Sequence, residues 1–160
     1  PPVSPHIAAE EAGVRIEPQR VVQSFDELAR RSDFVIVEGV GGWLAPISES
    51  STMQDIARAL ELPVVLVVGL RLGCLNHALL TARAIRDSGL ELVAWIGNRI
   101  DPHFERAAAN LATLETMLGL APLAVLPFQT GSMPAAVLDQ DAARHLQARL
   151  SSRASRSVGA

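Results

Sequence analysis

The sequence contains no lysine, because all 14 of its basic Lys and Arg residues are arginines. A catalytic lysine, such as the one that holds the transferred phosphate in P-loop enzymes, therefore cannot come from these 160 residues. The chain also has no tyrosine. It begins Pro1-Pro2-Val3 without an initiator methionine, which we interpret as a sign of processing or of a longer parent protein.

Other shortages exclude whole classes of protein. The single cysteine, Cys74, cannot form an internal disulfide, so the chain does not need an oxidising compartment. The longest apolar run, residues 62–70, is shorter than the roughly 20 residues that a membrane helix needs. The net charge of -3 argues against nucleic acid or an anionic membrane as a partner. We expect a cytoplasmic protein.

Short apolar runs that are typical of buried strands alternate with amphipathic patterns that are typical of helices. The predicted strands are residues 34–37, 64–68, 92–96 and 123–126. The predicted helices are residues 4–13, 18–31 and 52–60, one that ends near 88, 102–118 and 134–150. This alternation predicts an α/β fold with a parallel sheet. We expect one incomplete domain over residues 1–150 and a disordered tail at 151–160.

In parallel sheets the ligand lies beyond the carboxyl ends of the strands, so the residues after each strand are the candidates for a site. The first predicted strand leads into Glu38 and a turn with three glycines. A carboxylate beside a glycine-rich turn suits a magnesium-phosphate site, because Mg²⁺ takes one or two carboxylates and leaves the rest to phosphate. Alternatively, Glu38 caps the amides of a tight turn, and the chemistry alone leaves both open.

After the second predicted strand, Gly73 begins a helix whose free N–H groups could hold an anion, with Asn76 as a further donor. Cys74 at this position could be a nucleophile, but a lone cysteine among leucines is more often a packing residue. His77 is likewise more often part of a hydrogen-bonded scaffold than a catalyst. The spacing of these side chains does not predict a zinc site.

The last two predicted strands are followed by polar and apolar groups that could form a base pocket. Asn98 offers a donor and an acceptor that could match a purine edge, or it is simply a turn residue. The segment 126–129 (L-P-F-Q) offers a flat apolar surface, or it is a strand that ends at a proline.

Taken together, these segments resemble the dethiobiotin synthetases over nearly the whole chain. The matching segments are S-P-H at 4–6, V-E-G-V-G-G-W at 37–43, L-P-V-V-L-V-V-G at 62–69, L-G-C-L-N-H-A at 72–78, W-I-G-N at 95–98 and L-P-F at 126–128. The segment at 72–78 is highly specific, whereas V-E-G-x-G-G is shared with other P-loop proteins. The resemblance implies an α/β, P-loop NTPase-like parallel sheet flanked by helices, with the N-terminal strand and the P-loop missing.

The resemblance also implies an activity. Members of this family use ATP and Mg²⁺ to close the ureido ring of dethiobiotin from 7,8-diaminononanoate and CO₂ in biotin biosynthesis. The reaction passes through a carbamate and a carbamic-phosphoric anhydride, and it depends mainly on positioning and charge neutralisation. The family's catalytic lysine would lie upstream, so we expect the 160-residue chain alone to be inactive.

By the same resemblance, Glu38 would be the Mg²⁺ ligand and a homodimer would complete the substrate pocket. The implied ATP-binding residues are Glu38, Gly39, Val40, Gly41, Asn98, Arg99, Pro127, Phe128 and Gln129. The implied substrate-binding residues are Gly41, Gly73, Cys74 and Asn76. The family's tyrosine is replaced, with Asn110 about where it would fall, and residues 130–133 show no match for its acidic residue.

Two other hypotheses remain open. A cobyrinate amidase-like enzyme would share the Glu-Gly turn but should lack the L-G-C-L-N-H helix start. A non-catalytic, ATPase-like regulator would bind partners through exposed helix faces and should not bind the diamine.

Overall fold

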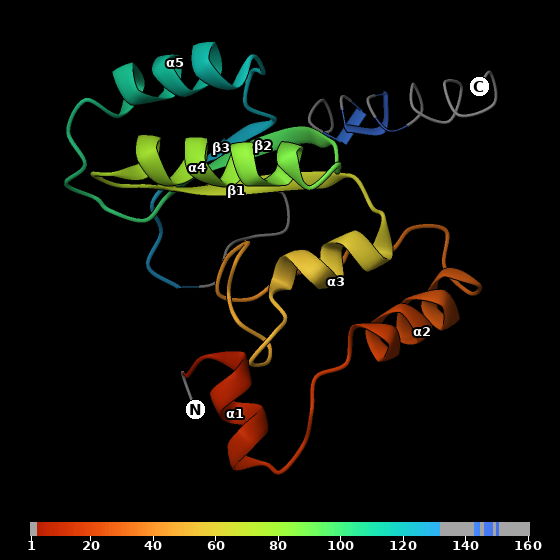
Figure 1. Cartoon of the computed structure of the whole chain (residues 1–160). Helices are drawn as coiled ribbons and strands as arrows, with labels where there is room; N and C mark the ends of the chain where they lie inside the picture. The colour runs from red at the N-terminus through yellow and green to blue at the C-terminus, as the bar shows by residue number, and fades with distance from the viewer. Residues whose placement is uncertain (1–2, 132–142, 145, 149, 151–160) are drawn as a thin grey trace. The chain divides into compact units, whose positions relative to one another are not determined.

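The computed structural model describes residues 3–131, 143–144, 146–148 and 150 (Figure 1). The chain divides into two compact units, and each is described by itself. The first contains residues up to 62 together with 87–90, and the second contains residues 63–86 and those from 91 onward. The prediction of a single domain over 1–150 stays a prediction, and the predicted tail at 151–160 lies outside the described residues.

Three helices form the first unit: α1 (Pro5–Glu11), α2 (Pro18–Ala29) and α3 (Met53–Leu60). All three confirm helices that the sequence predicts, with small shifts at their ends. Helix α3 begins with a reciprocal capping box between Thr52 and Asp55, in which the Asp55 carboxylate accepts the Thr52 backbone N–H at 2.7 Å. Helices α2 and α3 contact each other, and Ile47 and Ile56 are buried in this unit.

The prediction of a buried strand at residues 34–37 is wrong. The segment forms no ladder hydrogen bonds with any described strand, and the side chains of Phe34 and Ile36 are 62% and 82% exposed. A β-branched, apolar run favours an extended backbone, but a strand exists only where neighbouring strands satisfy its N–H and C=O groups. No described segment supplies those partners here.

The second unit contains a parallel sheet of three strands in the order β1-β2-β3: β1 (Val64–Leu70), β2 (Leu92–Arg99) and β3 (Ala124–Leu126). Helix α4 (Cys74–Asp87) connects β1 to β2, and helix α5 (Ala107–Leu118) connects β2 to β3. Right-handed crossovers between consecutive neighbouring strands place both helices on the same face of the sheet, as Figure 1 shows. This arrangement confirms the predicted α/β fold.

The core of the second unit lies between β2 and its two helices. On the helix-covered face, Trp95 of β2 and Leu114 of α5 are fully buried, and Ala82 and Ile85 of α4 are 1% exposed. Ala94, whose side chain points to the opposite face of the strand, is fully buried as well. The Trp95 indole donates its Nε1–H to the carbonyl of Leu120 at 2.7 Å, so its one polar group is satisfied. The central strand is therefore covered as the continuous apolar pattern predicts.

Two predicted boundaries are wrong in ways that matter for the site. Strand β2 continues three residues past 96, because its backbone stays paired with β1 through Arg99 and with β3 through Asn98. Helix α5 begins at Ala107 instead of 102. The Asp101 carboxylate accepts the His103 backbone N–H, and Arg106 has a left-handed φ of 57°, so residues 101–106 form a loop.

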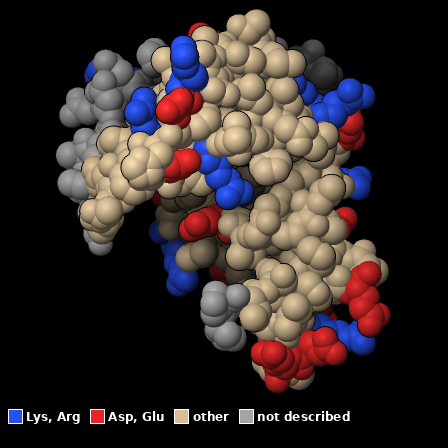
Figure 2. Space-filling model, turned by 90° about the vertical axis from the view of Figure 1, so that its left-hand side faces the viewer, with Lys and Arg blue, Asp and Glu red and all other residues tan. Residues whose placement is uncertain are grey.

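Of the helix predicted at 134–150, residues 143–144, 146–148 and 150 are helical, and the others lie outside the described residues. Among the described helices, none has the length and apolar character that crossing a membrane requires. On the face seen in Figure 2, arginines and acidic side chains lie among one another, without a continuous basic stripe.

Candidate functional site

A pocket of about 400 Å³ lies at the carboxyl ends of β2 and β3. Its walls come from the end of β2, the loop into α5, the first residue of α5, and β3 with the segment after it. The lining residues are Arg99, Asp101, Pro102, Phe104, Ala107, Val125, Pro127 and Phe128. This is the edge of a parallel sheet at which ligands bind, and the volume lies within the range of small-molecule sites.

The pocket combines apolar walls with two charged side chains. Phe104, Pro127 and Phe128 present flat apolar surface, and Phe128 is 39% exposed. Among the described residues of the lining, only Arg99 and Asp101 are ionisable, and no ion pair joins them. Such a pocket suits a flat, partly apolar ligand that also carries hydrogen-bond donors and acceptors.

Three of the predicted base-pocket residues meet around this cavity: Arg99, Pro127 and Phe128. Asn98 and Gln129 adjoin them in sequence but do not line it. Because successive side chains of a strand point to opposite faces, Asn98 and Arg99 cannot both face the pocket from regular β2 geometry. The sequence pattern could not indicate this, since Asn98 was expected after the strand and lies within it.

Asp101, Phe104 and Val125 line the pocket but were not among the predicted site residues. A signal for Asp101 was present: an Asp-Pro pair shortly after a strand favours a turn. The helix predicted from 102 hid this loop. Asp101 and Phe104 are therefore visible as pocket residues only once α5 is seen to begin at Ala107.

A second, smaller pocket of about 170 Å³ lies between β1 and the start of α4, and its lining includes Cys74 and His77. Gly73 precedes α4 with a φ of 91°, Cys74 is 2% exposed and Asn76 is exposed. Among the described residues, no backbone carbonyl accepts the N–H groups of Leu75 and Asn76. These features suit an anion at the helix start, and the burial of Cys74 favours its packing role.

The turn that contains Glu38 belongs to the first unit. Gly41 and Gly42 have φ values of 75° and 109°, and a Cβ added at Gly41 would lie 3.0 Å from the Ala45 Cβ. The indole of Trp43 donates to the Gln54 side chain at 2.8 Å, which fixes the end of the turn against α3. The Glu38 side chain is exposed, with no hydrogen-bond or ionic partner among the described residues.

The predicted site residues thus fall into separate groups. Glu38, Gly39, Val40 and Gly41 lie in the first unit, whereas the base-pocket residues and the group Gly73, Cys74 and Asn76 lie in the second. The three-stranded parallel sheet with its covering helices and a pocket at the strand ends defines an α/β protein, and this arrangement is consistent with a P-loop NTPase-like fold. The chain belongs to the AAA domain family, whose sequence model matches residues 1–136.

Similar proteins confirm the resemblance to dethiobiotin synthetases. The ATP-dependent dethiobiotin synthetase BioD of Aromatoleum aromaticum is 51% identical over 85% of this chain and 60% of its own length. The protein of the same name from Pseudomonas aeruginosa is 47% identical over 93% of this chain and 64% of its own length. That from Xanthomonas axonopodis is 45% identical over 82% and 58%. The chain thus spans about three fifths of the length of these relatives.

Proposed function

We propose that this chain forms part of an ATP-dependent dethiobiotin synthetase and supplies its base pocket, one metal ligand and part of its substrate site. The observation that carries the proposal is the pocket at the ends of β2 and β3, where Arg99, Pro127 and Phe128 gather. These residues come from two segments that are far apart in sequence, and both were expected at the adenine from the family's motifs.

In this proposal the adenine of ATP lies in that pocket, against Pro127 and Phe128 and beside Arg99. Asn98 and Gln129, which the family's motifs also imply at the adenine, adjoin the pocket in sequence without lining it. The backbone from Glu38 to Gly41 lies along the phosphates, where the glycines allow close approach. Because the chain has no lysine, another part of the protein supplies the phosphate cradle. The 160 residues alone should therefore bind the nucleoside but not transfer phosphate.

The donor set of the Glu38 turn fits a magnesium ion held mainly by phosphate. Glu38 is a single exposed carboxylate, free of partners among the described residues, and Mg²⁺ in nucleotide sites commonly takes only one or two carboxylates. Glu38 would hold the ion, which would neutralise the charge on the phosphates. Nothing else in the turn offers a ligand side chain.

The substrate would be 7,8-diaminononanoate, whose carboxylate suits the start of α4 at Gly73, Cys74 and Asn76. Gly41 is a further substrate-binding residue that the family's motifs imply. One amine takes up CO₂ to give a carbamate, and ATP phosphorylates the carbamate oxygen. The second amine then attacks the anhydride carbon, phosphate leaves, and the cyclic urea of dethiobiotin forms. The residues of this chain act by orienting the two reactants and holding charge. We propose a cytoplasmic homodimer as the working form.

A chimera tests this function. The part of the Aromatoleum aromaticum relative that does not align with this chain is joined to these 160 residues, and product is followed by mass spectrometry. The chimera should form dethiobiotin when ATP, Mg²⁺, CO₂ and the diamine are all present, whereas the 160-residue chain should form none. Product from the lysine-free chain alone would contradict the mechanism.

Glu38→Gln in the chimera separates the metal role from a structural role. It should lower the rate about 100-fold or more, and raised Mg²⁺ should recover part of it, because a preorganised charge contact in phosphoryl transfer contributes on this scale. Glu49→Gln is the matched control, since Glu49 is an exposed carboxylate in the same unit outside the turn. A chimera that folds but neither binds the diamine nor forms product would contradict the proposed function.

A further inference from the structure

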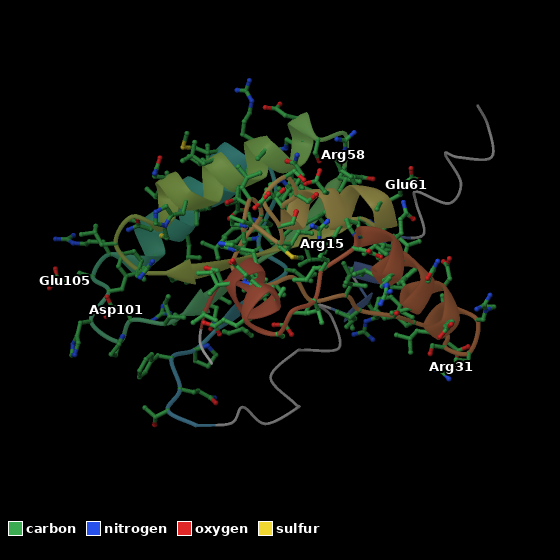
Figure 3. The ribbon with its side chains drawn as sticks, turned by 60° about the horizontal axis from the view of Figure 1, so that its bottom comes forward. Arg15, Arg31, Arg58, Glu61, Asp101 and Glu105 are labelled. Carbon is green, nitrogen blue, oxygen red and sulfur yellow. The ribbon has the colours of Figure 1, made fainter. Side chains whose placement is uncertain are left out.

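Asp101 stands apart from the rest of the pocket lining. It is half-buried, it lies two residues after the end of β2, and it contributes the only carboxylate among the described residues that line the pocket. Figure 3 shows it on the loop that leads from β2 into α5, with Glu105 further along the same loop. A ligand that covers a carboxylate in a largely apolar wall removes water from it. This desolvation costs free energy unless the ligand donates hydrogen bonds to the carboxylate.

The local backbone holds this side chain in place. Its Oδ1 accepts the backbone N–H of His103 at 2.9 Å, and the Asp101 carbonyl accepts the N–H of Phe104 at 3.4 Å. Its Oδ2 has no donor among the described residues, and no described arginine forms an ion pair with it. The hydrogen bond to Oδ1 therefore fixes the side-chain rotamer, and Oδ2 can still accept hydrogen bonds from a ligand.

We infer that Asp101 is a specificity-determining residue, whose Oδ2 accepts a hydrogen bond from the nucleoside in the pocket. The inference rests on the proposed function, because it takes the pocket to be the base pocket. An ionised carboxylate only accepts, so it selects ligands by their donors. Adenosine offers two kinds of donor, the 6-amino group of the base and the ribose hydroxyls. Analogues that lack one kind or the other identify which of them Asp101 contacts.

The experiment is a titration of the ¹⁵N-labelled 160-residue chain followed by amide chemical shifts. The ligands are adenosine, purine riboside (no 6-amino group) and 2′,3′-dideoxyadenosine (no ribose ring hydroxyls). They carry no phosphate, so binding does not depend on a phosphate cradle. Adenosine should shift amides near Arg99, Asp101 and Phe128. One analogue should bind about tenfold more weakly or worse, as expected for a lost hydrogen bond to a charged group.

Asp101→Asn keeps an oxygen for the His103 N–H and replaces the free oxygen with an amide NH₂. It should weaken adenosine binding about tenfold, and the analogue that binds poorly to the unaltered chain should lose no further affinity. Glu105→Gln is the matched control, because Glu105 is exposed on the same loop and does not line the pocket. It should leave all three affinities unchanged.

The possible failures are distinguishable. If the unaltered chain binds adenosine and both analogues equally well, the inference is wrong whether or not the variant folds. If Asp101→Asn binds adenosine as the unaltered chain does, or weakens all three ligands equally, Asp101 makes no such contact and the proposed function stands. If adenosine shifts no amide of the unaltered chain, the base pocket itself is wrong, and the inference fails with it.

Discussion

Two segments of similar apolar character have opposite environments in this molecule. Residues 34–37 (F-V-I-V) and residues 93–96 of β2 (V-A-W-I) are both short runs that predict a buried strand. In β2, Ala94 and Trp95 are fully buried, whereas Phe34 and Ile36 are 62% and 82% exposed. The difference lies in their neighbours, because β2 has a strand on each side and two helices over one face. An apolar run favours burial, but a segment becomes a buried strand only where other strands and helices pack against it.

The largest effect should come from the centre of β2. Trp95→Ala should lower the free energy of unfolding by about 3–5 kcal/mol, since it removes a fully buried aromatic side chain and leaves a cavity. It also leaves the Leu120 carbonyl without its indole donor. Urea denaturation followed by circular dichroism measures the change.

The other tryptophan provides the control for Trp95→Ala. Trp43 is partly buried in the first unit and donates to the Gln54 side chain at 2.8 Å. Trp43→Ala should lower the free energy of unfolding by clearly less, about 1–2 kcal/mol. A smaller apolar area of Trp43 is buried on folding, and water can replace the indole as the hydrogen-bond partner of the Gln54 side chain. Equal losses at the two positions would contradict the contrast between the two regions.

The region around β2 and residues 34–37 also differ in how well their structure could be predicted from the sequence. The strands and helices around Trp95 could be predicted from the spacing of apolar residues, from the glycines that end helices and from the residues that begin them. The prediction succeeds there because local sequence preference and tertiary packing favour the same structure. The strand at 34–37 could not be excluded from sequence, since its local preference is real and only its partners are absent among the described residues. The start of α5 was missed because a side-chain bond from Asp101 to the His103 N–H competes with the helix.

The candidate site divides in the same way. Arg99, Pro127 and Phe128 could be placed together from motif order, since parallel strands end at one edge of a sheet. Asp101 and Phe104 could not, because their position depends on six loop residues instead of a regular element. Asn98 shows what a motif alone cannot predict. The motif correctly indicated that Asn98 lies near the pocket, but only the pairing register shows that it lies within β2.

An intermediate effect is expected at the Glu38 turn. Gly41→Ala should destabilise the first unit by about 1–2 kcal/mol, because a non-glycine residue is strained at a φ of 75°. Its Cβ would also meet the Ala45 Cβ at 3.0 Å. Thermal unfolding monitored by amide signals of residues 3–62 measures this separately from the sheet.

Gly39→Ala is the matched control within the same turn. Gly39 does not have a positive φ, and an added Cβ would lie 3.4 Å from Met53 Cε, which is an ordinary contact with a flexible side chain. The change should therefore cost less than about 0.5 kcal/mol. Equal losses of stability for Gly39→Ala and Gly41→Ala would contradict the explanation that the turn requires glycine at position 41 because of its positive φ.

The smallest effect should come from the exposed run itself. Ile36→Ser should change the free energy of unfolding of this chain by less than about 0.5 kcal/mol, because an 82% exposed side chain loses little burial. Ile85→Ser, at a side chain 1% exposed in α4, should cost several times more, about 3 kcal/mol or above. A large loss for Ile36→Ser would mean that residues 34–37 are covered in solution. Repeating the measurement at several protein concentrations would then show whether a second copy covers them, since association makes apparent stability depend on concentration.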